Sequence, residues 1–69
     1  MDYYKVLIET EYDTFEMAYD NFEIALEEYL DWIVDVTCLH VTIFKYEYHY
    51  GHYKRSVVHE WNHIDGETK

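Results

Sequence analysis

Hydrophobic and polar side chains alternate over the first twenty residues, which predicts β-strands. In residues 3–12 the even-numbered positions from Tyr4 to Thr10 are uncharged. Alternate residues of a strand point to the same side, so these positions would form one uncharged face. Residues 15–19 alternate in the same way after a short turn, and we expect the two strands to form a hairpin. The alternative for the second segment is an early helix that Asp13 caps.

Apolar residues then recur with a helical period up to about Val34. Either Asp20 or Asn21 can cap this helix, and Glu23 follows Asp20 at the spacing of a capping box. At 100° per residue the apolar side chains form one stripe. Its members are Phe22, Ala25, Leu26, Tyr29 and Ile33, with Leu30 and Trp32 beside them. The opposite side carries Glu23, Glu27, Glu28, Asp31 and Asp35, with Ile24 among them.

Alternation returns over residues 37–50 and predicts a long third strand. Leu39, Val41 and Ile43 share one face, but the apolar positions change parity after Phe44. Either a bulge near Phe44 or a strand covered on both faces explains this change.

Gly51 marks the turn into a fourth strand over residues 52–63. The predicted fold is therefore α+β, with the order β-β-α-β-β and one helix packed on a four-stranded, mostly antiparallel sheet. Residues 1–69 form a single small acidic domain, and its last residues, 65–69, are expected to fray. A domain of this size buries only about 60% of its extended-chain surface, so dimerisation would add to its stability.

Composition narrows the class of protein. Aromatic residues make up 20% of the chain and hydrophobic residues 49%, which is too much for a disordered acidic tail. The lone Cys38 cannot form an internal disulfide, and the N-terminus lacks the features of a signal peptide, so we expect a cytoplasmic protein. The longest uncharged run, residues 36–44, is too short to span a membrane.

Charge is distributed very unevenly. The formal net charge is −10, and residues 1–35 hold eleven acids against the single base Lys5. Within the predicted helix, acids recur every fourth residue from Glu23, a spacing at which like charges destabilise a helix by roughly 0.2–0.5 kcal/mol per pair. Tolerance of this repulsion suggests that the negative surface serves a function. Simple solubility is the alternative, and phosphate repulsion argues against direct nucleic-acid binding.

The sequence His59-Glu60-Trp61-Asn62-His63 matches the zinc-protease pattern H-E-x-x-H. In the extended form of that pattern, Lys69 stands where a third histidine is required. The segment also reads as a strand, and residues four apart on a strand are about 13 Å apart, too far to share one zinc ion. We therefore expect no catalytic residue, no metal site and no cofactor.

Structural roles are the better interpretation of the remaining histidines and of the cysteine. His49 and His52 flank the predicted turn, His40 is expected to pack across strands, and Cys38 is expected to be a small buried hydrophobe. Tyrosines of the third strand could stack on single-stranded nucleic acid, but the net charge disfavours this. A protein interface is the better interpretation of these tyrosines.

The acidic row from Glu23 to Asp35, the acidic segment from Glu9 to Asp20 and the element order resemble small acidic host-takeover proteins of bacteriophages that mimic DNA. Within that class the chain is most similar to inhibitors of the bacterial histone-like protein HU from lytic phages of Bacillus. The resemblance implies a homodimer in the cytoplasm of a bacterial host that occupies the DNA-binding surface of HU.

These observations predict a non-enzymatic inhibitor that binds a basic DNA-binding protein. The residues expected to contact the partner are Glu23, Glu27, Glu28, Asp31, Asp35, Glu9, Glu11, Asp13, Glu16, Asp20 and Ile24. The first alternative is an assembly module that binds a different kind of protein through the tyrosine-rich strand, and the second is a metal-dependent enzyme.

Overall fold

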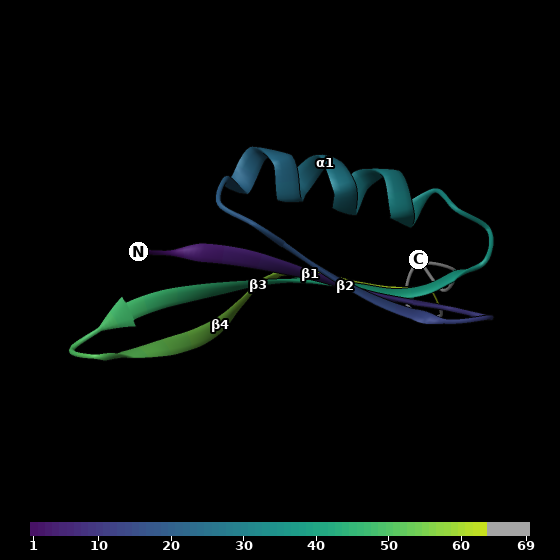
Figure 1. The fold of residues 1–69 in the computed structure, drawn as a ribbon. Coiled ribbons are helices and arrows are strands. Elements are labelled where there is room, and N and C mark those ends of the chain that lie inside the picture. Colours follow the sequence, from purple (N-terminus) through teal and green to yellow (C-terminus); the bar gives the residue numbers. More distant parts are fainter. Residues whose placement is uncertain (64–69) are drawn as a thin grey trace.

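The computed structural model describes residues 1–63, which form one helix lying on a four-stranded antiparallel sheet (Figure 1). In chain order the elements are β1 (Tyr3–Thr10), β2 (Thr14–Tyr19), α1 (Phe22–Ile33), β3 (Cys38–His49) and β4 (His52–Asn62). The strand order in the sheet is β2-β1-β3-β4, so β2 and β4 are its edges. The predicted α+β architecture and element order are confirmed. The expected fraying of residues 65–69 falls outside the described residues.

The first hairpin is a true strand pair, so the alternative of an early helix is wrong. Val6 of β1 lies opposite Met17 of β2 in an antiparallel register. Asp13 stabilises the turn instead of capping a helix: its carbonyl oxygen accepts a hydrogen bond from the Thr10 backbone N–H at 2.8 Å. Helix α1 begins after Asn21, whose side chain accepts from the Glu23 backbone N–H at 2.7 Å.

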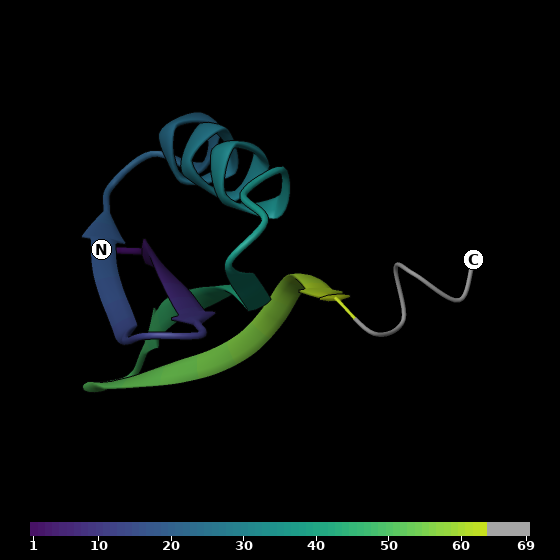
Figure 2. The ribbon, with the colours of Figure 1, turned by 90° about the vertical axis from the view of Figure 1, so that its right-hand side faces the viewer.

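The hydrophobic core lies between α1 and one face of the sheet. Its fully buried members are Val6, Ile8, Ala25, Cys38, Val41 and Ile43. The register pairs Val6 with Ile43 and Ile8 with Val41. Because alternate strand residues point to the same face, all four lie under the helix. The predicted helix stripe packs against this core, except that Leu30 remains 49% exposed. Figure 2 shows the helix above one face of the twisted sheet, and the described residues leave the opposite, open face uncovered.

A pairing irregularity does lie beside Phe44, as one of the two sequence interpretations expected, but its extra residue belongs to β4 and not to β3. Pairing between β3 and β1 continues without a shift through Phe44. The irregularity lies in the pairing with β4, where Val58 is the extra residue between the partners of Ile43 and Phe44. Ile43 therefore faces the helix, while Phe44 and Tyr46 lie on the open face. The tyrosines beyond Phe44 mark a second apolar surface.

The β3–β4 hairpin projects beyond the N-terminal end of the helix (Figure 1). Its loop consists of Tyr50 and Gly51, and both have positive φ angles, 47° and 90°. Two-residue loops with positive φ at both positions match the right-handed twist of the flanking strands. Gly51 adopts this conformation freely, whereas a tyrosine rarely does.

Candidate functional site

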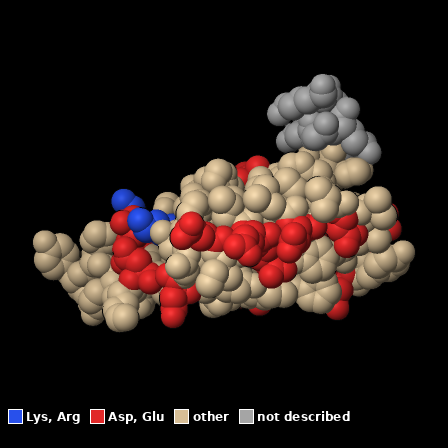
Figure 3. Space-filling model, turned by 90° about the horizontal axis from the view of Figure 1, so that it is seen from above, with Lys and Arg blue, Asp and Glu red and all other residues tan. Residues whose placement is uncertain are grey.

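Three carboxylates form a row on the outer face of α1. Glu23, Glu27 and Asp31 recur every fourth residue and are all exposed. Within residues 1–63 their carboxylates make no ion pair and no hydrogen bond. We call these three residues the helix row. Figure 3, which looks down on the helix side of the molecule, shows acidic side chains in a band along its length, with basic side chains gathered near one end. Ile24 is 50% exposed on the same helix.

Asp35 does not extend this row, which corrects the predicted spacing. Helix α1 ends at Ile33 with Val34 as its C-cap, so Asp35 lies in the following turn. One of its carboxylate oxygens accepts hydrogen bonds from the Thr37 hydroxyl at 2.7 Å and from the Thr37 backbone N–H at 2.8 Å. These bonds lower the pKa of the exposed Asp35 carboxyl. Asp35 therefore organises the turn that leads into β3.

Glu28 also departs from its predicted place on the outer face. It is partly buried against the sheet, where Tyr19 donates a hydrogen bond to one carboxylate oxygen at 3.1 Å. The indole N–H of Trp32 donates to the other oxygen at 2.8 Å. Burial, together with this Glu28 contact, raises the pKa of the Tyr19 hydroxyl. Glu28 is therefore a structural residue that ties α1 to β2.

The acids of the first hairpin do not join the helix row as a group. Glu16 lies opposite Leu7 on the open face and forms an ion pair with Lys5 at 3.6 Å. Glu9 also lies on that face, with His40 as its partner at 3.1 Å. Strand alternation decides this placement, because neighbours of core residues point away from the helix. The other predicted contact residues, Glu11, Asp13 and Asp20, are exposed in the turns before and after β2.

The open face carries an aromatic cluster that the sequence revealed only in part. We call Tyr3, Tyr46, Tyr48 and Tyr53 the tyrosine cluster. The rings of Tyr3 and Tyr46 are stacked with centroids 4.8 Å apart, and Tyr53 meets Tyr3 edge-on at 5.2 Å. The Lys5 ammonium lies 5.3 Å from the centre of the Tyr46 ring. Alternation in the third strand predicted Tyr46 and Tyr48, whereas Tyr3 and Tyr53 join them only through strand pairing.

His40 lies across neighbouring strands, as expected, but sequence reasoning missed its two carboxylate partners. Its Nδ1 atom lies 3.1 Å from Glu9 and its Nε2 atom 2.8 Å from Glu60, so it connects β3 to both neighbouring strands. Partial burial alone lowers the pKa of His40, but hydrogen bonds to Glu60 and Glu9 and their charges outweigh this effect. The pKa of the imidazole therefore lies above its ordinary value.

The histidines of the H-E-x-x-H sequence are not arranged as a zinc site within the described residues. His59 lies in strand β4, as predicted, and its ring packs against Phe22 and Tyr29 of the helix at centroid distances of 5.9 and 5.6 Å. Among residues 1–63 no group of three or more His, Cys, Asp or Glu side chains is placed to hold a metal ion. Cys38 is fully buried, as expected, and burial raises the pKa of its thiol.

Helix α1, the helix found within residues 1–63, lacks the length and apolar character needed to cross a membrane. Comparison of the chain with protein-family models, with curated proteins and with solved structures finds no match to any of them.

Proposed function

We propose that this protein is a non-enzymatic inhibitor that binds a basic DNA-binding protein in place of DNA. The observation that carries the proposal is the helix row, in which Glu23, Glu27 and Asp31 are exposed and have no cationic partner among residues 1–63. A carboxylate row without internal neutralisation is available to lysine and arginine side chains of another protein.

The spacing of the helix row supports mimicry of a phosphate backbone. Residues four apart on a helix have Cβ atoms about 5–6 Å apart, while phosphates of one DNA strand recur about every 3.4 Å along the axis. Both are dense lines of negative charge on a rigid support. A protein that holds DNA mainly through Lys and Arg can therefore engage either surface, with fast and salt-sensitive association.

The first target to test is the bacterial histone-like protein HU, which the resemblance to phage DNA mimics suggests. On this proposal the inhibitor acts in the cytoplasm of a bacterial host as a homodimer, and it occupies the surface of HU that otherwise binds DNA. The proposed contact surface consists of the helix row, Ile24 and the neighbouring exposed acids Asp20, Glu11 and Asp13.

A competition experiment tests the proposal. Purified HU is bound to a fluorescent DNA duplex, and the protein is added while anisotropy reports release of the DNA. The protein should release the duplex, and added salt should weaken the effect because both interactions are ionic. The double variant Glu27→Lys/Asp31→Lys should lose the ability to compete.

The matched control compares two single variants. Glu27→Lys and Glu47→Lys change the net charge equally, but Glu47 lies in β3 beside Lys45 at 3.8 Å. Mimicry through the helix row requires Glu27→Lys to weaken competition much more than Glu47→Lys does. Equal effects of both variants would mean that net charge alone is responsible, and the proposal would be rejected.

The tyrosine cluster supports a second candidate function, an assembly module that binds a protein of another class. The ring centroids of its exposed members Tyr48 and Tyr53 are 5.2 Å apart, in the hairpin that projects beyond the N-terminal end of the helix (Figure 1). Tyrosine is common at protein interfaces. Under this alternative Tyr48→Ser weakens capture of the partner while Glu27→Lys leaves it unchanged. The reverse result favours the helix row.

A further inference from the structure

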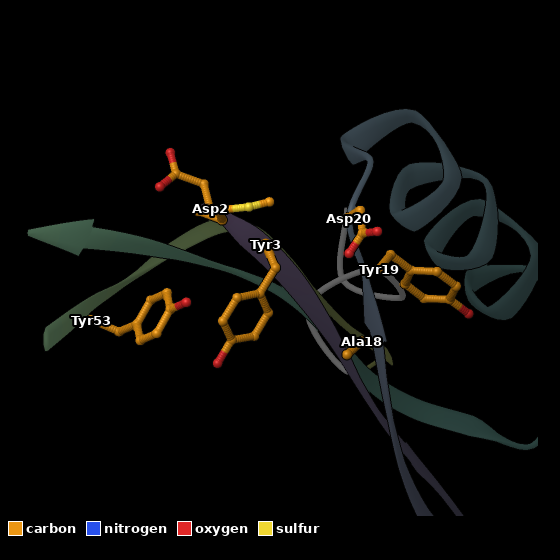
Figure 4. A pocket seen from close by; sticks show the side chains of 7 residues that line it. Asp2, Tyr3, Ala18, Tyr19, Asp20 and Tyr53 are labelled. Carbon is orange, nitrogen blue, oxygen red and sulfur yellow. The ribbon is translucent and has the colours of Figure 1, made fainter. Parts of the chain in front are cut away.

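A groove lies beside the start of β1 and the end of β2. It has a volume of about 630 Å³, and its walls include Asp2, Tyr3, Ala18, Asp20 and Tyr53. Figure 4 shows the Tyr3 ring between Tyr53 on one side and Ala18 and Asp20 on the other. The groove is therefore built from strands β1, β2 and β4, from the residues before β1 and from the turn that leads into the helix.

One ring face of Tyr3 is available to this groove. The other face stacks on Tyr46 of β3, with an angle of 3° between the ring planes. Since β1 lies between β3 and β2, the available face looks toward β2. The register pairs Tyr4 with Tyr19, which places Asp20 next to Tyr3 across the strands. An aromatic face and a carboxylate thus stand on opposite walls.

The small side chain of Ala18 keeps the groove open. Ala18 lies opposite Lys5, one strand position before Tyr19, and is exposed on the open face. The Lys5 ammonium itself is engaged elsewhere, 3.6 Å from Glu16 and 5.3 Å from the centre of the Tyr46 ring. A larger residue at position 18 would extend into the groove that Ala18 lines.

This combination of walls selects a ligand chemistry. A cation is attracted to the face of an aromatic ring and to the Asp20 carboxylate. An anion is repelled by Asp20 and by Asp2, one of whose carboxylate oxygens accepts a hydrogen bond from the Tyr48 backbone N–H at 3.2 Å. The aromatic and methyl surfaces suit the aliphatic stem of a long side chain whose charged head reaches the rim. Lysine and arginine have both parts.

We infer that this groove receives a lysine or arginine side chain of the basic partner, an inference that rests on the function proposed above. Asp20 immediately precedes Asn21, the N-cap of α1, so the groove lies at the N-terminal end of the helix row. Because Tyr3 and Ala18 lie on the open face, a basic partner that covers the row reaches the groove around the β2 edge of the sheet. The helix row supplies general attraction, and the groove anchors one side chain.

The test uses a tetra-arginine peptide as the probe at low salt, with backbone amide shifts of the labelled protein followed by NMR. Amides of Tyr3, Ala18 and Asp20 should shift on titration. Ala18→Leu fills the groove without changing any charge and should weaken peptide binding about tenfold, which is the loss of one cation–π contact and one charged contact. Ala18→Ser keeps the groove open, and its affinity for the peptide should be within about twofold of that of the original protein.

A second variant covers the case in which leucine disturbs the edge strand β2. Asp20→Asn leaves the side-chain shape unchanged and should also weaken peptide binding, beyond the effect of Glu47→Gln, which removes one charge from β3 outside the proposed contact surface. Circular dichroism verifies the fold of each variant.

The outcomes separate the two proposals. Suppose that Ala18→Leu and Asp20→Asn bind the peptide as the original protein does, while Glu27→Lys/Asp31→Lys abolishes binding. The groove is then not an anchor, and the helix row stands. If peptide binding is unchanged in all of these variants, both proposals are overturned. Loss in Ala18→Leu with no loss in Ala18→Ser supports the groove.

Discussion

The Nε2 atom of His40 lies 2.8 Å from a carboxylate oxygen of Glu60, across the β3–β4 pair. On the other side of the ring, Nδ1 lies 3.1 Å from Glu9 of β1. A neutral imidazole has one N–H donor, so two carboxylates can both accept hydrogen bonds only from the protonated ring. His40 in its charged form therefore connects three strands on the open face.

This arrangement predicts a pH-dependent contribution to stability. Because the pKa of His40 is raised in the folded state, the contribution is fully present below the unfolded-state pKa of about 6.5 and is lost as the pH rises through the folded-state pKa. The free energy of unfolding should fall by about 1 kcal/mol over this interval, a modest value because both carboxylates are half exposed. Urea denaturation of the protein and of His40→Gln at several pH values measures it. An identical pH dependence in the variant would contradict the assignment.

The adjacent glutamates Glu27 and Glu28 of α1 should differ in how much their truncation lowers the stability. Glu28→Ala removes the acceptor for Tyr19 and Trp32 and should lower the free energy of unfolding by about 1–2 kcal/mol. Glu27→Ala removes only an exposed side chain of the helix row and should change it by less than about 0.5 kcal/mol. Thermal and urea denaturation of the two variants provide the comparison, and equal destabilisation would show that Glu28 is not a structural tie.

The loop of the β3–β4 hairpin should accept a stabilising substitution. Tyr50 is 98% exposed and has a φ of 47°, a conformation that asparagine tolerates better than tyrosine. Tyr50→Asn should therefore raise the free energy of unfolding by about 0.5–1 kcal/mol. Gly51→Ala should lower the free energy of unfolding by about 1 kcal/mol, because alanine is strained at a φ of 90°. A steric clash does not contribute, since an added Cβ meets no atom within 4 Å. A destabilised Tyr50→Asn variant would indicate contacts of the Tyr50 ring that favour the native loop.

A charge reversal in the helix row should raise the stability of the protein and weaken its binding to the proposed partner. Glu27→Lys replaces repulsion from Glu23 and Asp31 by attraction, so it should raise the free energy of unfolding by about 0.5–1 kcal/mol at low salt. The same change should weaken displacement of DNA from HU. Denaturation and competition assays on one protein sample test both effects. A variant that is less stable, or one that competes normally, contradicts the interpretation of the row as a functional surface.

Local patterns were sufficient to predict the elements. Alternation at Val6 and Ile8 and the helical stripe of Phe22, Ala25 and Tyr29 depend on which positions one face must bury, and that information is present in short segments. The two-residue loop at Gly51 is equally local. These local signals agree with one another, which is why the predicted α+β class matches the structure.

Partners across strands could not be predicted from periodicity. Tyr3 and Tyr46 are far apart in the chain, and their stacking depends on the register between β1 and β3. The triad of His40, Glu9 and Glu60 likewise requires three strands in one order. A shift of one residue in either register would turn these side chains to the other face.

The amino-acid sequence by itself determined the composition and the net charge, which are sums over its residues. It also determined the element order and the exposed spacing of Glu23, Glu27 and Asp31, because these depend on neighbours within a few residues. Only the tertiary structure decided which of the other acids are engaged internally. Glu28 accepts from Tyr19, Glu9 pairs with His40 and Glu16 pairs with Lys5 because packing and strand pairing bring these partners to them. Among the described residues, the row of acids without an internal partner is therefore shorter than the acid content suggests, and it lies on one face of a single helix.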